Sequence, residues 1–282
     1  MNVIPINELT NSSSIKYKYI YYYKCKCRNN YNFGDMITQY IYIKLTNTKP
    51  INDINGGRKK EDVIIGAGSV IGVSRSNSII WGTGSMFKHT RLIKPKKILS
   101  VRGPLTRKVV INNGYDCPEI YGDIGLILSY FYNPAVKKKF EIGIIPHYVD
   151  VIDFHKIFKT YDSDKIKVID ITDSIETVID NVLSCNMIMS SSLHGIICAH
   201  AYNIPCIWIR ITNKIAGGNF KYHDYYGSLN IKNYTDIRPY ILSENLSVEK
   251  IKTLINEYPN PVFPIKTKHI LELCPFITIK KT

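Results

Sequence analysis

The chain has 282 residues, which is enough for two domains of ordinary size and a sizeable hydrophobic core. Hydrophobic residues make up 45% and charged residues 21%, and no apolar run reaches the roughly 18 residues that a membrane span needs. The first residues also lack the basic start and long apolar centre of a secretory signal. We therefore expect a cytoplasmic protein without a transmembrane segment, either free or peripheral to a membrane.

The net charge is +14, from 37 Lys and Arg against 23 Asp and Glu, and it favours anionic partners in general. The lysines are dispersed, with only KPKK and VKKK as short runs, which is more typical of a solvated surface than of a nucleic-acid face. No nucleic acid partner is therefore expected. The seven scattered cysteines indicate reduced thiols, and the CxC of Cys25 and Cys27 is only a weak metal signal.

The first third of the chain begins with a segment, residues 1–14, that we expect to be loose. IKYKYIYYYKCKC then predicts a strand, and NYNFGDMITQYIYIKL predicts a helix from its apolar spacing. Asp35 is expected to cap this helix, with Gly34 directly before it. Asp35 and Asp123, in FGD and YGD, are each either turn residues or candidate general bases.

Glycine turns follow the next predicted strands. DVIIGAGSVIG and IIWGTGS each read as a buried parallel strand ending in glycines. Gly66, Gly68 and Gly72 form a GxGxxxG that suggests a dinucleotide turn, but no clear helix and no acidic residue follow at the required distance. We therefore favour glycine turns that line a cleft.

The segment KKILSVRGPLTRKVVINNG predicts a strand, Arg102, and a helix that starts at Pro104 and stops at Gly114. An arginine at a helix start is unfavourable with the helix dipole, unless it clamps an anion bound there. Strands and helices alternate in this way throughout the chain, which predicts parallel α/β layers. The polar linker NPAVKKK separates a domain of residues 1–135 from one of residues 140–258, and residues 259–282, rich in proline, are expected to be an irregular tail.

The most informative segment is MSSSLHGIICAHAYNIP. It lies between two buried strands, SCNMIM and CIWIRI, and predicts a helix capped by Ser191 or Ser192, with His194 one residue inside it. Such a helix start suits an anion. A zinc site made by His194, Cys198, His200 and Cys206 is disfavoured because these residues lie on different faces, and a serine nucleophile is disfavoured because no GxSxG turn occurs.

Seven motifs in register resemble those of the polysaccharide pyruvyl transferases, over roughly Asn32 to Trp208. These are NFGD, IIGAGS, WGTGS, SVRGPLTR, YGDIGLIL, IGIIPHY and SSSLHGIICAHAYNIP. The resemblance implies two Rossmann-like domains of the GT-B glycosyltransferase type that face a cleft, with the acceptor on the N-terminal side and phosphoenolpyruvate on the C-terminal side. It implies transfer of the enolpyruvyl unit onto sugar hydroxyls, which gives a pyruvate ketal and phosphate, as in the exopolysaccharide ketal branch.

The same resemblance suggests roles for residues of this chain. His194 would bind phosphate or act as acid, Arg102 would hold the donor, and Asp35 or Asp123 would assist the hydroxyl. The expected substrate-binding residues are Arg102, Ser192, Leu193, Gly34, Gly68 and Lys214. No metal and no cofactor are expected, and the partners would be phosphoenolpyruvate and a saccharide or glycan acceptor, lipid-linked acceptors included.

One position departs from the family pattern. Many members carry an arginine two residues before the histidine, where this chain has Ser192. Lys214 or Arg210 would have to replace that arginine, and Gly217 and Gly218 make their loop a candidate flap. Two alternatives stay open at this point: a GT-B glycosyltransferase that uses a nucleotide sugar, and a basic module that binds nucleic acid.

Overall fold

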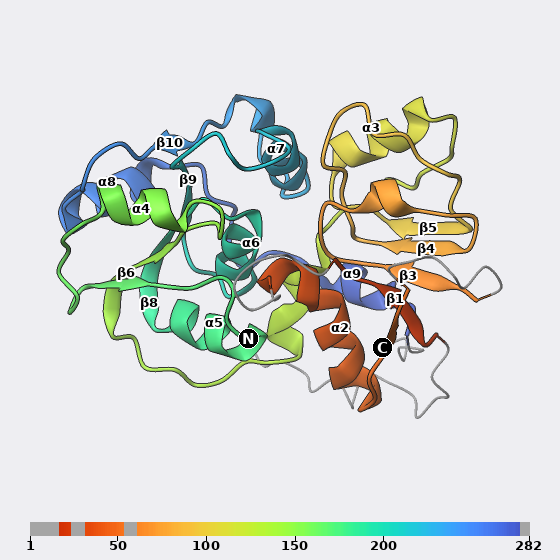
Figure 1. The fold of residues 1–282 in the computed structure, drawn as a ribbon, viewed down its shortest axis with the longest axis horizontal. Coiled ribbons are helices and arrows are strands. Elements are labelled where there is room, and N and C mark those ends of the chain that lie inside the picture. The colour runs from red at the N-terminus through yellow and green to blue at the C-terminus, as the bar shows by residue number, and fades with distance from the viewer. Residues whose placement is uncertain (1–16, 24–31, 54–60, 277–282) are drawn as a thin grey trace.

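The computed structural model describes residues 17–23, 32–53 and 61–276. These residues form an α/β protein with two parallel five-stranded sheets, each flanked by helices (Figure 1). The α/β class predicted from the alternation of strands and helices is therefore confirmed. The predictions for residues 1–14 and for Cys25 and Cys27 lie outside the described residues.

The first sheet has the strand order β2-β1-β3-β4-β5, with every pair parallel. Its strands are β1 (Tyr19–Tyr21), β2 (Ile51–Asn52), β3 (Val63–Ile65), β4 (Ser78–Trp81) and β5 (Lys97–Ser100). The helices of this half are α2 (Phe33–Thr46), η1 (Ile71–Val73), α3 (Pro104–Asn112) and η2 (Ile124–Tyr130). The two apolar runs ending in glycine thus form β3 and β4, and Pro104 opens α3 as predicted.

The start of α2 differs from the prediction. The N-cap is Asn32, whose side chain accepts a hydrogen bond from the backbone N–H of Gly34, and Asp35 lies inside the first turn. The prediction of Asp35 as the cap was therefore wrong by three residues. The reason is that asparagine caps as well as aspartate does, so the earlier of the two residues took the position. The carboxylate of Asp35 is thus left without a capping role.

The second sheet has the order β10-β9-β8-β6-β7 and is again parallel. Its strands are β6 (Phe140–Ile145), β7 (Ile166–Val168), β8 (Cys185–Ser190), β9 (Cys206–Arg210) and β10 (Tyr240–Ile241). The helices are α4 (Val151–Ile157), α5 (Ile175–Leu183), α6 (Leu193–Ala201), α7 (Phe220–Gly227), η3 (Tyr234–Asp236) and α8 (Val248–Glu257). Ser247 caps α8 by accepting from the N–H of Lys250.

The C-terminal segment is more ordered than predicted. Residues 259–282 were expected to be irregular, but α9 (Lys268–Glu272) forms within them and packs against η2 of the first half. The indole Nε1 of Trp81 donates to the carbonyl of Ile270 at 3.0 Å. Buried residues of α2, α6 and α9 belong to one hydrophobic cluster that runs through both halves, and each half has a further cluster of its own. Within the described residues no helix is long and apolar enough to cross a membrane.

Candidate active site

A cavity of about 510 Å³ lies where the two halves of the chain meet. Its wall includes Asp35, Gly68 and Ser69 from the first half and His147, His194 and Lys221 from the second. We call this space the interdomain cavity. Ser192, Leu193 and Lys214 line it as well. Six of the nine residues predicted for the site therefore share one cavity: Asp35, Gly68, Ser192, Leu193, His194 and Lys214.

His194 is the second residue of α6, as predicted, and the serine turn before it fixes the helix start. Ser192 is the N-cap but its side chain makes no capping hydrogen bond. The hydroxyl of Ser190 accepts from the N–H of Ser192 at 3.0 Å and donates to the carbonyl of Ile145. The first N–H groups of α6 have no acceptor within the helix, and they form the positive end of its dipole. An anion in the cavity would meet both the free N–H groups and the positive end of the helix dipole.

The imidazole of His194 is enclosed by residues of the first half. Its Nε2 lies 3.7 Å from Oδ2 of Asp123, too far for a hydrogen bond, and both atoms are buried without a hydrogen-bond partner among the described residues. Asp123 is fully buried, and its Oδ1 accepts from the N–H of Gly125. On the other side, a Cβ on Gly34 would lie 2.0 Å from Nδ1 of His194. Gly34 therefore leaves room for the ring, and the carboxylate of Asp123 faces its Nε2 without a hydrogen bond.

Asp35 is the acidic residue among the described residues that line the cavity. Its Oδ2 accepts from Nδ2 of Asn32 at 3.0 Å. Burial raises the pKa of Asp35 to about 6, although nearby His194 acts in the opposite direction. A carboxylate with this pKa is charged at neutral pH and is a stronger base than an ordinary aspartate, so it is suited to take a proton from a hydroxyl.

His147 lines the cavity but was not among the predicted site residues. It follows β6, and its Nδ1 accepts from the N–H of Val149 at 3.3 Å, which places the ring proton on Nε2. Burial lowers the pKa of His147 to about 3, and Lys221 and His194 add to that shift. The ring is therefore a neutral hydrogen-bond donor. Its position after an apolar strand, in IGIIPHY, was the signal available in the sequence.

Lys221 was also missed. It lies in the first turn of α7, only 6% exposed, and lines the cavity opposite the first half. The sequence carries no clear sign of this position, because FKYHDYYG lacks a regular apolar stripe. The carboxylate of Asp35, in the first half, is close enough to act on the pKa of Lys221, which it raises.

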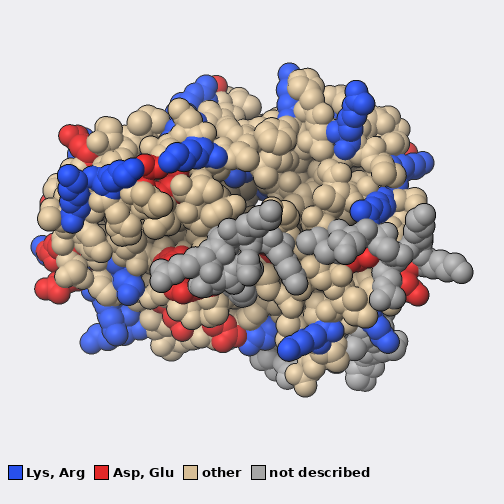
Figure 2. All heavy atoms as spheres, viewed as in Figure 1, with Lys and Arg blue, Asp and Glu red and all other residues tan. Residues whose placement is uncertain are grey.

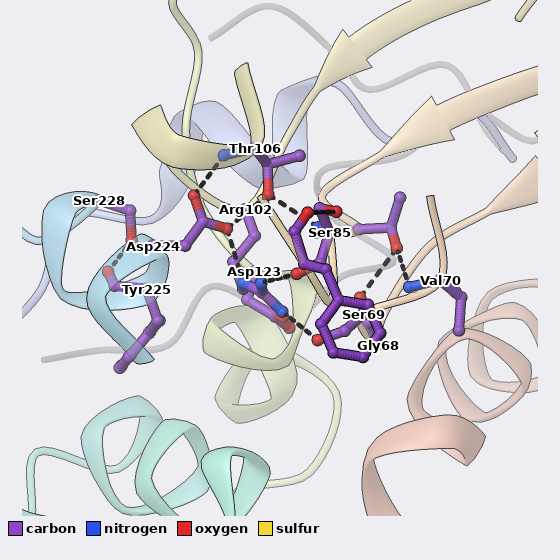
Figure 3. A network of polar contacts seen from close by, with 12 residues as sticks. Gly68, Ser69, Val70, Ser85, Arg102, Thr106, Asp123, Asp224, Tyr225 and Ser228 are labelled. Carbon is purple, nitrogen blue, oxygen red and sulfur yellow. Dashed lines mark hydrogen bonds and ion pairs between the residues drawn. The ribbon is translucent and has the colours of Figure 1, made fainter. Parts of the chain in front are cut away.

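Arg102 lies at the strand-to-helix junction that was predicted, yet it faces the protein interior (Figure 3). The guanidinium is fully buried and donates to Oδ2 of Asp224 at 2.9 Å, to Oγ of Ser69 at 2.6 Å and to the carbonyl of Ser85 at 2.8 Å. Asp224 also accepts from the N–H and hydroxyl of Thr106. We call these five residues the Arg102 cluster. It joins α3 to α7, and Arg102 reaches the cavity only through Ser69.

The two proposed substitutes for the missing arginine are both engaged elsewhere. Lys214 lines the cavity but its side chain is 61% exposed and forms an ion pair with Asp153. Arg210 donates to the side chain of Asn219 and does not line the interdomain cavity. The flap suggested by Gly217 and Gly218 touches the first half, since Gly217 packs against Met86.

The two other motifs noted in the sequence have structural explanations. Gly66 packs against Thr38 of α2, and the 3₁₀ turn η1, not an α-helix, follows the GxGxxxG segment. Cys198 is fully buried and burial raises the pKa of its thiol, while His200 pairs with the hydroxyl of Tyr225 at 2.9 Å. Among the residues that the structure describes, no three His, Cys, Asp or Glu side chains are grouped to hold a metal.

On the face shown in Figure 2, lysines and arginines lie in several separate places, with Asp and Glu among them. The chain therefore presents no single basic area on this face, in line with the dispersed lysines of the sequence. The buried charges at the junction of the two halves are more informative than this surface.

Comparison with known proteins agrees with these features. The family model described as polysaccharide pyruvyl transferase matches residues 6–213. A similar chain is the uncharacterized protein L143 of Acanthamoeba polyphaga mimivirus, which is 32% identical over 203 residues, or 69% of each chain. No solved structure matches. The matched region contains the cavity residues up to His194 and the serine turn before it, and the chain belongs to the polysaccharide pyruvyl transferase family, a family of pyruvyl-transferring enzymes that act on saccharides.

Proposed function

We propose that the protein transfers the enolpyruvyl unit of phosphoenolpyruvate to hydroxyl groups of a saccharide or glycan precursor, forming a pyruvate ketal and releasing phosphate. The observation that carries this proposal is the grouping of His194, the start of α6 and Asp35 around one cavity between the two halves. Phosphoenolpyruvate has a phosphate and a carboxylate, and the acceptor must lose protons. The cavity offers donors for the anions and a base for the hydroxyl. A GT-B arrangement of the two halves is part of the proposal.

The donor side lies on the second half. The N–H groups at the start of α6 and the neutral Nε2–H of His147 bind the anionic groups, with Ser192 and Leu193 beside them. His194 then either contacts the phosphate or protonates the methylene carbon, which becomes a methyl group. Asp123, 3.7 Å from Nε2, stabilises the charged imidazole before that proton leaves.

Protonation leaves the adjacent carbon electron-deficient, and an acceptor hydroxyl oxygen attacks it while Asp35 takes the hydroxyl proton. Phosphate leaves with its bridging oxygen, and a second hydroxyl closes the ketal at the same carbon. Two hydroxyl protons are lost overall; one balances the new C–H bond and the other goes to phosphate. The raised pKa of Asp35, about 6, supports its part in this step.

The acceptor side lies on the first half and at the rim of the cavity. Aromatic side chains gather there: Tyr21, Tyr23, Phe87 and Tyr148. Phe87 is 56% exposed, although it is a large apolar residue. Aromatic rings present apolar faces on which the C–H face of a sugar ring packs, and the proposal places the acceptor on them.

Phosphate release measures the proposed reaction. The protein is incubated with phosphoenolpyruvate and a panel of glycosides, and phosphate should appear only with an acceptor that becomes pyruvylated, as mass spectrometry then verifies. A protein that is folded but binds no phosphoenolpyruvate by calorimetry would contradict the proposal.

The nucleotide-sugar glycosyltransferase is the competing enzyme function. Thermal shifts with a nucleoside diphosphate and with phosphoenolpyruvate, measured side by side, separate the two. Stabilisation by the nucleoside diphosphate alone would replace the proposal with that alternative, because a ligand stabilises only the fold that binds it.

A further inference from the structure

We propose that Lys221 binds an anionic group of the donor in the interdomain cavity, supplying from α7 the second cation that the sequence suggested for Lys214 or Arg210. This inference rests on the proposed function for the identity of the donor. The existence of an anion site at Lys221 depends only on the geometry of the cavity.

The first argument is the absence of a protein partner. Lys221 is only 6% exposed, and none of the residues that the structure describes forms a hydrogen bond or ion pair with its ammonium group. Its Nζ lies 5.4 Å from the centroid of the Tyr222 ring. A largely buried ammonium group that lines a cavity without an ion pair is stabilised by an anion that enters the cavity.

The second argument is that the other candidate cations already have partners. Lys214 is paired with Asp153 at the surface, Arg210 is bound to Asn219, and Arg102 is bound to Asp224. Of the described lysines and arginines that line the cavity, Lys214 and Lys221, only Lys221 is both buried and unpaired.

The third argument is that Lys221 is held in place before any ligand binds. Asp224 lies three residues further along α7 and is fixed to α3 by Arg102 and Thr106. The helix that carries Lys221 is thus attached to the opposite half of the molecule. A cation held in this way loses little freedom on binding, which favours affinity.

The electrostatic surroundings are consistent with anion binding at neutral pH. Burial and the neighbouring Arg102 lower the pKa of Lys221 to about 8, while Asp35 and Asp150 act in the opposite direction. His147 faces the same space and is neutral because its pKa is about 3. The ammonium form therefore dominates below about pH 8, and donor binding is expected to weaken as the pH rises above that value.

Calorimetry with phosphoenolpyruvate and, separately, with inorganic phosphate tests the inference. Lys221→Met should weaken the binding of phosphoenolpyruvate roughly 10- to 100-fold, the effect of losing one charge-assisted hydrogen bond, and Lys221→Arg should keep part of the affinity. Lys232→Met, an exposed lysine in the loop after α7, is the matched control and should bind as the unchanged protein does. Thermal unfolding checks that each variant is folded; Lys221→Gln serves as a second neutral variant.

The outcomes separate this inference from the proposed function. Equal binding of phosphoenolpyruvate by the unchanged protein and Lys221→Met overturns the role of Lys221 and leaves the proposed function standing. Binding of phosphate but not of phosphoenolpyruvate, lost in Lys221→Met, keeps the anion site and overturns the proposed donor. Binding of neither ligand by the folded, unchanged protein overturns both.

Discussion

Two sets of buried charges lie close together in this molecule and differ in how they are satisfied. In the Arg102 cluster every charge has a partner: Arg102 has three acceptors and Asp224 has three donors. Lys221 and His194 line the interdomain cavity; Lys221 has no ion pair with the described residues, and Nε2 of His194 stays 3.7 Å from Oδ2 of the buried Asp123. The first set is thus satisfied within the protein, whereas the second keeps polar groups without partners among the described residues, as expected of groups that act on a ligand.

The largest effect is expected in the cavity, from His194→Ala. We expect it to reduce turnover about 10²- to 10⁴-fold, because a positioned acid or base contributes that much, with little change in thermal stability. Phosphate release with saturating substrates is the measurement. A variant that keeps full turnover would remove His194 from the mechanism and make the cavity charges structural as well.

The next largest effect is expected in the Arg102 cluster, on the stability of the fold. Asp224→Ala leaves the buried guanidinium of Arg102 uncompensated and should reduce the free energy of unfolding by about 3–5 kcal/mol, measured by urea titration. Glu119→Ala removes the partner of Arg107 in a surface ion pair and is the matched control, with an expected loss of at most about 1 kcal/mol. Equal losses in the two variants would mean that the Arg102 cluster stabilises the fold no more than a surface ion pair does.

A smaller loss of stability is expected from Thr106→Val, which keeps the shape of the side chain. It removes the hydroxyl that donates to Asp224 and accepts from the N–H of Ser85 at 2.8 Å. We expect a loss of about 1–3 kcal/mol by urea titration, since the buried N–H of Ser85 is left unpaired and Asp224 loses one of its three donors. An unchanged unfolding curve would mean that the cluster depends on its ion pair alone.

The smallest effect is the pH dependence set by Asp35. Because its pKa is raised to about 6, the basic form is present above that pH and is lost as the pH falls through it. kcat/KM should therefore fall about tenfold per pH unit below pH 6. Asp35→Asn should lower the activity and abolish the fall of kcat/KM below pH 6. If that fall persists in the variant, another group causes it.

Much of the fold was predictable because it depends on local patterns. The apolar runs ending in glycine form strands and Pro104 opens α3, because each of these features depends only on neighbouring residues. The cap of α2 was wrong because Asn32 and Asp35 are both acceptable caps and only the packed structure chooses between them.

The site was predictable in part for a similar reason. His194, Asp35 and Gly68 lie at ends of elements that the motifs mark, and the structure places them together. The partner of Arg102 was not predictable, because Asp224 lies 122 residues away in the sequence. Lys221 was missed for the same reason: its burial follows from how the two halves meet, which no short segment encodes.

The packing of α9 on the first half has a consequence for how the protein is made. Trp81, near the middle of the first sheet, donates to the carbonyl of Ile270 and meets the ring of Phe276 edge-on, with 5.8 Å between the ring centroids. Ile270 and Phe276 follow every strand of the second sheet along the chain. The packing around Trp81 can therefore be completed only after the whole of the second sheet has been synthesised.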